Sequence, residues 1–151
     1  MLDAELVAAR WYLGELSGEE MSAIACQVLE DGQDGKHLRY LAGLSSPARR
    51  DILETVEGAL RELGARVPIT RHEAAVLIAR RIAQEILEGR IEPYAGACRI
   101  AIVYSFGLPE LEQWDNLTLN YEVAKGATEL EEAKTQILRE ARRLRAQGLR
   151  P

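Results

Sequence analysis

Two pairs of acidic residues have a spacing that could hold a metal ion over a phosphate. Glu85 and Glu88 form one pair, and Glu112 and Asp115 form the other, with the members of each pair three residues apart. This separation places both carboxylates of a pair on one face of a helix. Magnesium prefers oxygen ligands and is commonly bound by carboxylates together with substrate phosphates. The four residues therefore define a candidate magnesium site, provided that their helices lie together.

The ExxE and ExxD spacing of these pairs resembles that of the all-α nucleoside triphosphate pyrophosphohydrolases. The resemblance implies magnesium-dependent nucleotide hydrolysis as an alternative function. The chain departs from the family pattern, because an apolar helical segment separates the two pairs and no basic cluster lies near the second pair. Pairs with the same spacing also occur at Glu54 with Glu57 and at Glu129 with Glu132, where they are typical of solvated helix faces.

Other motifs for metal or cofactor chemistry are incomplete. His72 and Glu73 begin like the helical zinc-protease motif, but Val76 stands where the second histidine is needed. The acidic stretch of residues 30–35 does not form a calcium loop, because Leu41 occupies the position of the bidentate glutamate. The sequence has no glycine-rich phosphate loop, nucleophile elbow or paired-cysteine metal motif. We therefore expect no cofactor and favour a non-catalytic function.

Helix start and stop signals recur along the chain and predict an all-α fold. Three hydroxyl residues stand three positions before a glutamate, which is the spacing of a capping box, and Ser46 followed by Pro47 is a fourth start signal. Glycines follow four periodic segments, where a left-handed residue commonly ends a helix. The capping pairs are Ser17 with Glu20, Thr70 with Glu73 and Thr128 with Glu131, and the stop glycines are Gly32, Gly64, Gly89 and Gly148.

The helical period of the apolar residues predicts a single bundle of seven or eight helices within one domain, residues 1–151. Pro68 disfavours helical geometry at Val67, so a linker at 65–69 divides an N-terminal half, 1–64, from a C-terminal half, 70–148. The two most apolar segments, starting at residues 71 and 93, should form the centre of the core. The expected helices span residues 2–15, 18–31, 35–43, 47–63, 71–88, 93–106, 109–125 and 129–147.

Composition limits the class of protein. The 151 residues are 47% hydrophobic and 28% charged, as in ordinary globular domains. Cys26 and Cys98 lie in apolar runs, so we expect reduced core thiols and a reducing compartment. Neither a signal peptide nor a membrane span is predicted, and a cytoplasmic location without a membrane partner is therefore expected.

The excess negative charge lies in the first half of the chain. Residues 1–75 carry 13 acidic and 8 basic side chains, and the remaining residues carry 11 of each. An acidic half disfavours nucleic acid and favours a basic protein partner. We predict a docking surface on the second and third helices with Tyr40 as an aromatic anchor, although such a face could serve solubility alone. Its acidic residues are Glu19, Glu20, Glu30, Asp31 and Asp34.

Two groups of arginines have alternative interpretations. The C-terminal arginines are Arg139, Arg142, Arg143, Arg145 and Arg150, and because the last helix begins with acids and ends with bases, its polarity complements the helix dipole. No aromatic residue interleaves these arginines, so nucleic-acid binding is disfavoured. Arg99 lies among apolar residues, either on the polar stripe of its helix or in a buried pair with an acid such as Glu73 or Glu85, which would make it a candidate site residue.

Residues 82–97 have the pattern of a helix corner. Gly89 should end one helix with a positive φ, Pro93 should begin the next, Tyr94 should pack at the corner and Gly96 should permit close approach. The stretch resembles a helix-Gly-x-Ile-x-Pro-Tyr-x-Gly-Ala-helix segment of small uncharacterised bacterial helical proteins, some of which look like immunity or toxin-neutralising proteins. The resemblance covers the C-terminal half and implies a scaffold. The sequence thus predicts a helical protein-binding module of the immunity or adaptor kind and leaves homo-oligomerisation open.

Overall fold

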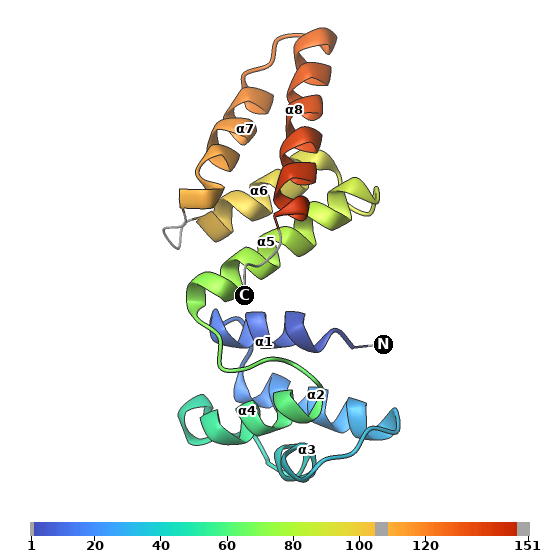
Figure 1. Ribbon diagram of the computed structural model, residues 1–151, viewed down its shortest axis with the longest axis vertical. Helices are drawn as coiled ribbons and strands as arrows, with labels where there is room; N and C mark the ends of the chain where they lie inside the picture. The colour runs from blue at the N-terminus through green and yellow to red at the C-terminus, as the bar shows by residue number, and fades with distance from the viewer. Residues whose placement is uncertain (1, 105–108, 148–151) are drawn as a thin grey trace. The chain divides into compact units, whose positions relative to one another are not determined.

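The all-α fold is confirmed. The computed structural model describes residues 2–104 and 109–147, and these ranges contain eight α-helices, two short 3-10 helices and no strand (Figure 1). Its contacts divide the chain into two compact units, Met1–Ala74 and Ala75–Pro151. The elements are α1 (Ala4–Tyr12), α2 (Gly18–Glu30), α3 (Lys36–Ala42), η1 (Arg49–Asp51), α4 (Leu53–Glu62), α5 (Arg71–Leu87), α6 (Pro93–Tyr104), η2 (Pro109–Leu111), α7 (Gln113–Glu122) and α8 (Ala127–Ala146).

Two of the predicted capping boxes are present. The Ser17 hydroxyl accepts a hydrogen bond from the Glu20 backbone N–H, and the Glu20 carboxylate accepts one from the Ser17 N–H. Thr70 and Glu73 make the same two bonds. These reciprocal bonds satisfy amides that have no partner within the helix, which explains why α2 and α5 begin where the sequence predicts.

The third capping box, predicted at Thr128 and Glu131, is wrong. Helix α8 begins at Ala127, so Thr128 already lies in its first turn. The carboxylate of Glu129, rather than that of Glu131, accepts a hydrogen bond from the Lys125 backbone N–H at 2.7 Å. The spacing of Thr128 and Glu131 therefore does not mark the start of α8.

The predicted start at Pro47 is also wrong, whereas three predicted stops are confirmed. Ser46 has a φ of 45°, and a 3-10 turn at Arg49–Asp51 intervenes before α4 begins at Leu53. The stop glycines Gly32, Gly64 and Gly89 have φ values of 97°, 92° and 73°, respectively. Gly148 lies outside the described residues. A positive φ strains any residue with a Cβ, so glycine suits these helix ends.

The first unit packs helices α1–α4 around Trp11, which is 2% exposed. The predicted linker lies in the irregular segment between α4 and α5. The buried cluster combines aliphatic side chains from all four helices with this single aromatic ring, and the large residues in it are Val7, Trp11, Leu16, Met21, Val28, Leu38, Leu41, Ile52, Val56 and Leu60.

The second unit contains most of α5 together with α6, α7 and α8. Helix α6 packs against α7 and α8, which also contact each other (Figure 1). Helix α5 buries one apolar stripe, namely Ala75, Ile78, Ala79, Ile82 and Ile86. Helix α8 buries only one side, through Ala133, Ile137, Ala141 and Leu144, and leaves its opposite side exposed.

Both cysteines are free thiols, but their predicted place in the core is wrong. Cys26 is exposed on α2, where its thiol contacts the Ala42 carbonyl oxygen at 3.5 Å. Cys98 is partly buried on α6. In α2 the buried positions are Met21, Ala25 and Val28, and Cys26 follows the buried Ala25 by one residue, which turns it about 100° away from the core.

Candidate functional site

An open hollow of about 520 Å³ in the first unit is lined by three glutamates. Its walls come from the turn between α1 and α2, the first turn of α2, and the segment that precedes α4. The polar side chains that line it are Glu15, Ser17, Glu19, Glu20, Ser46 and Arg49. Only Glu19 and Glu20 belong to the predicted docking surface.

Two glycines allow the backbone to form this hollow. Gly14 has a φ of 80° and reverses the chain after α1, which places Glu15 at the edge. Gly18 lies against the segment before α4, because a Cβ at this position would be only 2.2 Å from the Pro47 carbonyl oxygen. The start of α2 can approach Ser46 and Pro47 this closely only with glycine at position 18.

Arg49 links the segment that precedes α4 to the end of α1 and the turn between α1 and α2. Its guanidinium lies 3.6 Å from the centre of the Trp11 ring and donates hydrogen bonds to the carbonyl oxygens of Leu16, at 2.8 Å, and Trp11. Burial lowers the pKa of the Arg49 guanidinium, but an arginine remains protonated at neutral pH. Its donors are therefore used to hold the turn between α1 and α2, and this interaction was not predicted from the sequence.

The three glutamates differ in how they are held. The Glu20 carboxylate is fixed by the capping box. Glu15 lies 3.5 Å from Arg10, and both side chains are 44% exposed, which gives a weak and screened ion pair. Glu19 is exposed and makes no ion pair with another described residue. The hollow thus presents carboxylates that can accept charge-assisted hydrogen bonds from an ammonium or guanidinium group.

The remaining acids of the predicted docking surface lie at the other end of α2. Glu30 is the last residue of the helix and Asp31 caps it. At a rise of 1.5 Å per residue, Glu30 lies about 18 Å from Gly18 along the helix. The five predicted acids therefore do not form one cluster but two groups.

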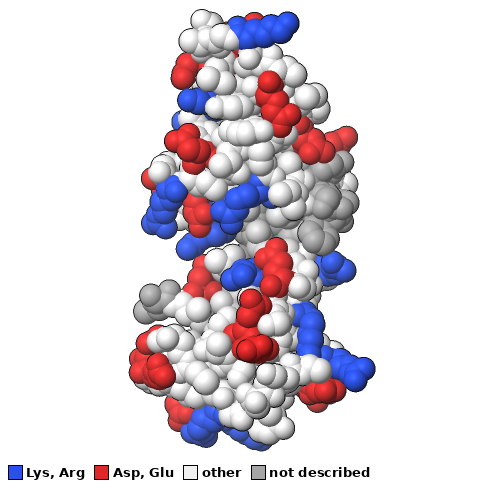
Figure 2. Space-filling model, turned by 180° about the vertical axis from the view of Figure 1, so that it is seen from behind, with Lys and Arg blue, Asp and Glu red and all other residues white. Residues whose placement is uncertain are grey.

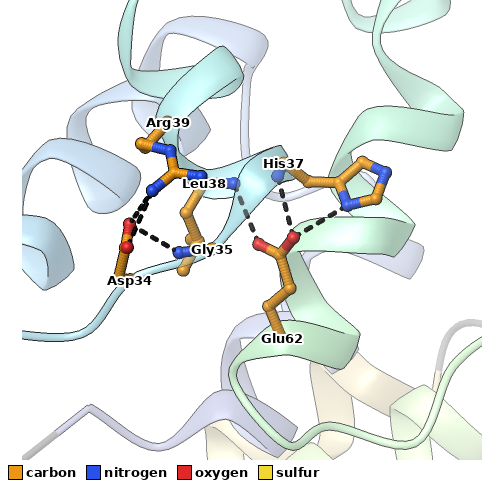
Figure 3. A network of polar contacts seen from close by, with 6 residues as sticks. All are labelled: Asp34, Gly35, His37, Leu38, Arg39 and Glu62. Atoms are coloured by element: carbon orange, nitrogen blue, oxygen red, sulfur yellow. Dashed lines mark hydrogen bonds and ion pairs between the residues drawn. The ribbon is translucent and has the colours of Figure 1, made fainter.

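Asp34 and Tyr40 belong to this second group. The Asp34 carboxylate accepts two hydrogen bonds from the Arg39 guanidinium, at 2.7 and 2.9 Å, and one from the Gly35 N–H (Figure 3). Arg39 thus compensates the charge of Asp34 locally. Tyr40 is 61% exposed, as an anchor residue would have to be. With one arginine beside three acids, this end of α2 carries the same formal charge as the hollow, where Arg49 lies beside Glu15, Glu19 and Glu20, so the two groups differ in geometry and not in charge.

Glu62 forms a polar network with α3 that the sequence does not reveal. Its carboxylate accepts hydrogen bonds from the His37 N–H at 2.8 Å and the Leu38 N–H at 3.0 Å, and it contacts His37 Nδ1 at 2.8 Å (Figure 3). The N-cap residue, Gly35, has no side chain with which to cap α3. Glu62, at the last position of α4, therefore acts as the cap from a distance of 25 residues.

The same contacts determine the ionisation of Glu62. Burial by itself would raise the pKa of this carboxyl group, but the N–H groups of His37 and Leu38 and the His37 side chain outweigh burial and lower the pKa below its ordinary value. The His37 ring also packs over Gly58, where a Cβ would lie 2.5 Å from ring atoms. These interactions assign a structural role to His37 and Glu62.

The four carboxylates of the candidate magnesium site are not arranged as a metal site. In the parts of the chain that the structure describes, no group of three or more His, Cys, Asp and Glu side chains could hold a metal ion. Glu85 lies 3.9 Å from Arg99, whose side chain is 56% exposed, so this arginine lies on the polar side of α6 and not in a buried pair. Glu88 lies 2.9 Å from Arg90 and accepts a hydrogen bond from Gln84. Both members of the first pair thus have basic or amide partners.

The predicted helix corner contains a close helix approach. Gly89 has the predicted positive φ, and a Cβ on Gly96 would lie 2.4 Å from Cγ1 of Ile86. Tyr94 stacks on Tyr121 of α7, with ring centres 4.4 Å apart and planes 11° from parallel. The Tyr94 hydroxyl donates to Glu122 at 2.7 Å, and this bond is the main reason that the pKa of Tyr94 is raised.

Surface charge elsewhere is mixed. Figure 2 shows acidic and basic side chains interspersed over one face, so neither sign covers that face continuously. Across the described residues, no helix has the length and apolar character required to cross a membrane. Comparisons of the chain with protein-family models, curated proteins and solved structures found no match.

Proposed function

We propose that this chain is a non-catalytic protein-binding module, of the immunity or adaptor kind, that binds a basic segment of a partner at the hollow between α1 and α2. The observation that carries the proposal is the presence of Glu15, Glu19 and Glu20 around one open hollow of about 520 Å³. That size lies within the range of roughly 300–1,000 Å³ for small-molecule pockets, so a lysine or arginine side chain with its flanking backbone would fit. A cytoplasmic location is part of the same proposal.

The geometry favours binding with a small entropic cost. Arg49 and the capping box hold the backbone of the walls and the Glu20 side chain, so the ordering on binding is confined to the Glu15 and Glu19 side chains. An arginine of the partner could donate two parallel hydrogen bonds to Glu19, which makes no ion pair with another described residue. The alternative, magnesium-dependent nucleotide hydrolysis, has no comparable support because Glu85 and Glu88 already have partners.

The proposal is tested by capturing partners from a cell extract with three forms of the protein. The hollow variant carries Glu15→Lys and Glu19→Lys, and Glu20 is kept because it caps α2. The matched control carries Glu30→Lys and Asp31→Lys, which change the net charge equally at the other end of the same helix.

A protein that is retained by the wild type and the control but lost by the hollow variant, and that is released by salt, supports the proposal. Equal capture by all three forms would contradict it. If only the control failed to retain the captured protein, the docking surface would instead be the group containing Asp34 and Tyr40.

A further inference from the structure

On the outward side of α8 an acidic residue comes first and basic residues follow. This order is complementary in charge to a second α8 that runs in the opposite direction. Glu132 lies in the first half of the helix and Arg139 and Arg142 lie in the second half, and all three side chains are exposed. The opposite side of the helix is buried in the second unit. The outward side is therefore available to a partner along most of the length of α8.

Several of these charges have no partner within the described chain. Glu132, Arg139 and Arg142 make no ion pair with any other described residue. An open hollow of about 520 Å³ runs along the same side and is lined by Thr128, Glu132, Thr135 and Arg139, among others. The face thus combines uncompensated charges of both signs with a small residue, Thr135, near its middle.

We propose that a second copy of this chain binds here, with its α8 antiparallel to the first. A two-fold axis between Thr135 and Gln136 places Glu132 opposite Arg139 of the second copy, because these two residues lie only about 20° apart around the helix. Each contact then occurs twice, as in every isologous interface. Thr135 beside the axis is small, and the Gln136 side chain is bonded to Asn120 of α7, so the two helices can approach to about 8–10 Å, the usual packing distance.

Apolar side chains beside this face add to the interface. Leu119 and Val123 on α7 are 53% and 58% exposed. They flank Asn120, whose side chain donates a hydrogen bond to Gln136 of α8 at 3.4 Å. Ion pairs at a surface contribute little on their own. Burial of these two side chains by the second copy supplies the apolar component that a specific interface needs.

The charge pattern favours a second copy over other occupants. A nucleic acid would be attracted by the arginines but repelled by Glu131 and Glu132 on the same face. A partner with a uniformly charged surface would match only one half of α8. A reversed copy of α8 matches both halves, because its own acidic start meets the basic end of the first copy.

Sedimentation equilibrium over a wide range of protein concentration, at low and high salt, tests the proposal. We expect a reversible dimer that dissociates more readily in salt. Glu132→Arg and Arg139→Glu should each weaken the dimer by about tenfold or more, since symmetry turns two attractive pairs into repulsive ones. The double variant should restore the wild-type affinity. Glu54→Arg, an exposed charge reversal in the first unit, is the control and should have no effect.

Three results would overturn the proposal: a wild-type protein that stays monomeric at every concentration, a dimer that neither single variant weakens, or a double variant that fails to recover. The outcome is independent of the hollow in the first unit, because none of these substitutions lies there.

Discussion

Replacing Glu62 with alanine tests whether one carboxylate fastens α3 to α4. The substitution removes both backbone hydrogen bonds, at 2.8 and 3.0 Å, and the contact with the His37 ring at 2.8 Å. Helix α3 has seven residues, and Gly35 offers it no side-chain cap. Without Glu62, the half-buried first amides of this short helix would have no protein partner.

The expected loss can be worked out from these contacts. Removing an N-cap costs about 0.5–2 kcal/mol, and hydrogen bonds to charged groups contribute about 1.5–3 kcal/mol. The three contacts share one carboxylate and are not additive. Because the Glu62 side chain is still 20% exposed, water can replace part of the loss. We therefore expect Glu62→Ala to lower the free energy of unfolding by about 2–3 kcal/mol, and Glu62→Gln by about half of that.

Urea unfolding and hydrogen exchange together measure this effect. Exchange at residues 36–42 is needed because the two units can unfold separately, in which case a single transition would not report on α3. Glu54→Gln, an exposed change on the same helix α4, should stay within about 0.5 kcal/mol of the wild type. If Glu62→Ala behaved like this control, the capping role of Glu62 would be refuted.

The pH dependence provides a separate check. The folded structure lowers the pKa of Glu62 below its ordinary value of 4.5. The ionised carboxylate therefore stabilises the fold fully above that value, and this contribution is lost as the pH falls through the lowered pKa. The stability difference between the wild type and Glu62→Gln should accordingly be large at neutral pH and shrink on acidification. A difference that stays constant down to the acid transition would contradict the assignment.

Two further predictions concern the glycines of the helix corner and the ionisation of two tyrosines. Gly96→Leu should lower the free energy of unfolding of the second unit by about 1–3 kcal/mol or more, because Ile86 leaves no room for a Cβ. Gly89→Val should lower it by about 1 kcal/mol or more because of the positive φ. Unchanged melting temperatures for both variants would contradict these structural roles. In an ultraviolet titration, Tyr94 and Tyr12 should ionise above the ordinary tyrosine range, because the pKa of Tyr94 is raised chiefly by its bond to a carboxylate and that of Tyr12 chiefly by burial. Tyr94→Phe should remove one of these late steps, and a single shared step for all tyrosines would contradict the bond of Tyr94 to Glu122 and the burial of Tyr12.

Local signals explain why the sequence predicts the helices well. The capping pair at Ser17 and the stop at Gly89 act within one helical turn, so their effect can be read from residues three or four positions apart. The failures have a common cause, which is that a distant contact overrides the local signal. Ser46 and Pro47 do not start a helix because the chain there is held against Gly18 and by the hydrogen bonds of Arg49.

The candidate site was predicted only in part for the same reason. Charge counting identifies Glu19 but cannot show that Glu15 joins it, because the turn at Gly14 brings them around one hollow. Pairs such as Arg49 with Trp11 and Glu62 with His37 are 38 and 25 residues apart. No spacing rule relates residues at such separations, and only the packing of the helices brings them together.

The central claim, that the hollow binds a basic segment, is tested most directly by nuclear magnetic resonance with a short synthetic peptide of arginine and glycine as the probe. Amide signals of residues 14–20 and of Ser46, Ala48 and Arg49 should shift in a saturable manner, and the Glu15→Lys, Glu19→Lys variant should lose these shifts while the Glu30→Lys, Asp31→Lys control retains them. Shifts that spread over all acidic segments without saturation, or that persist in the hollow variant, would contradict the account.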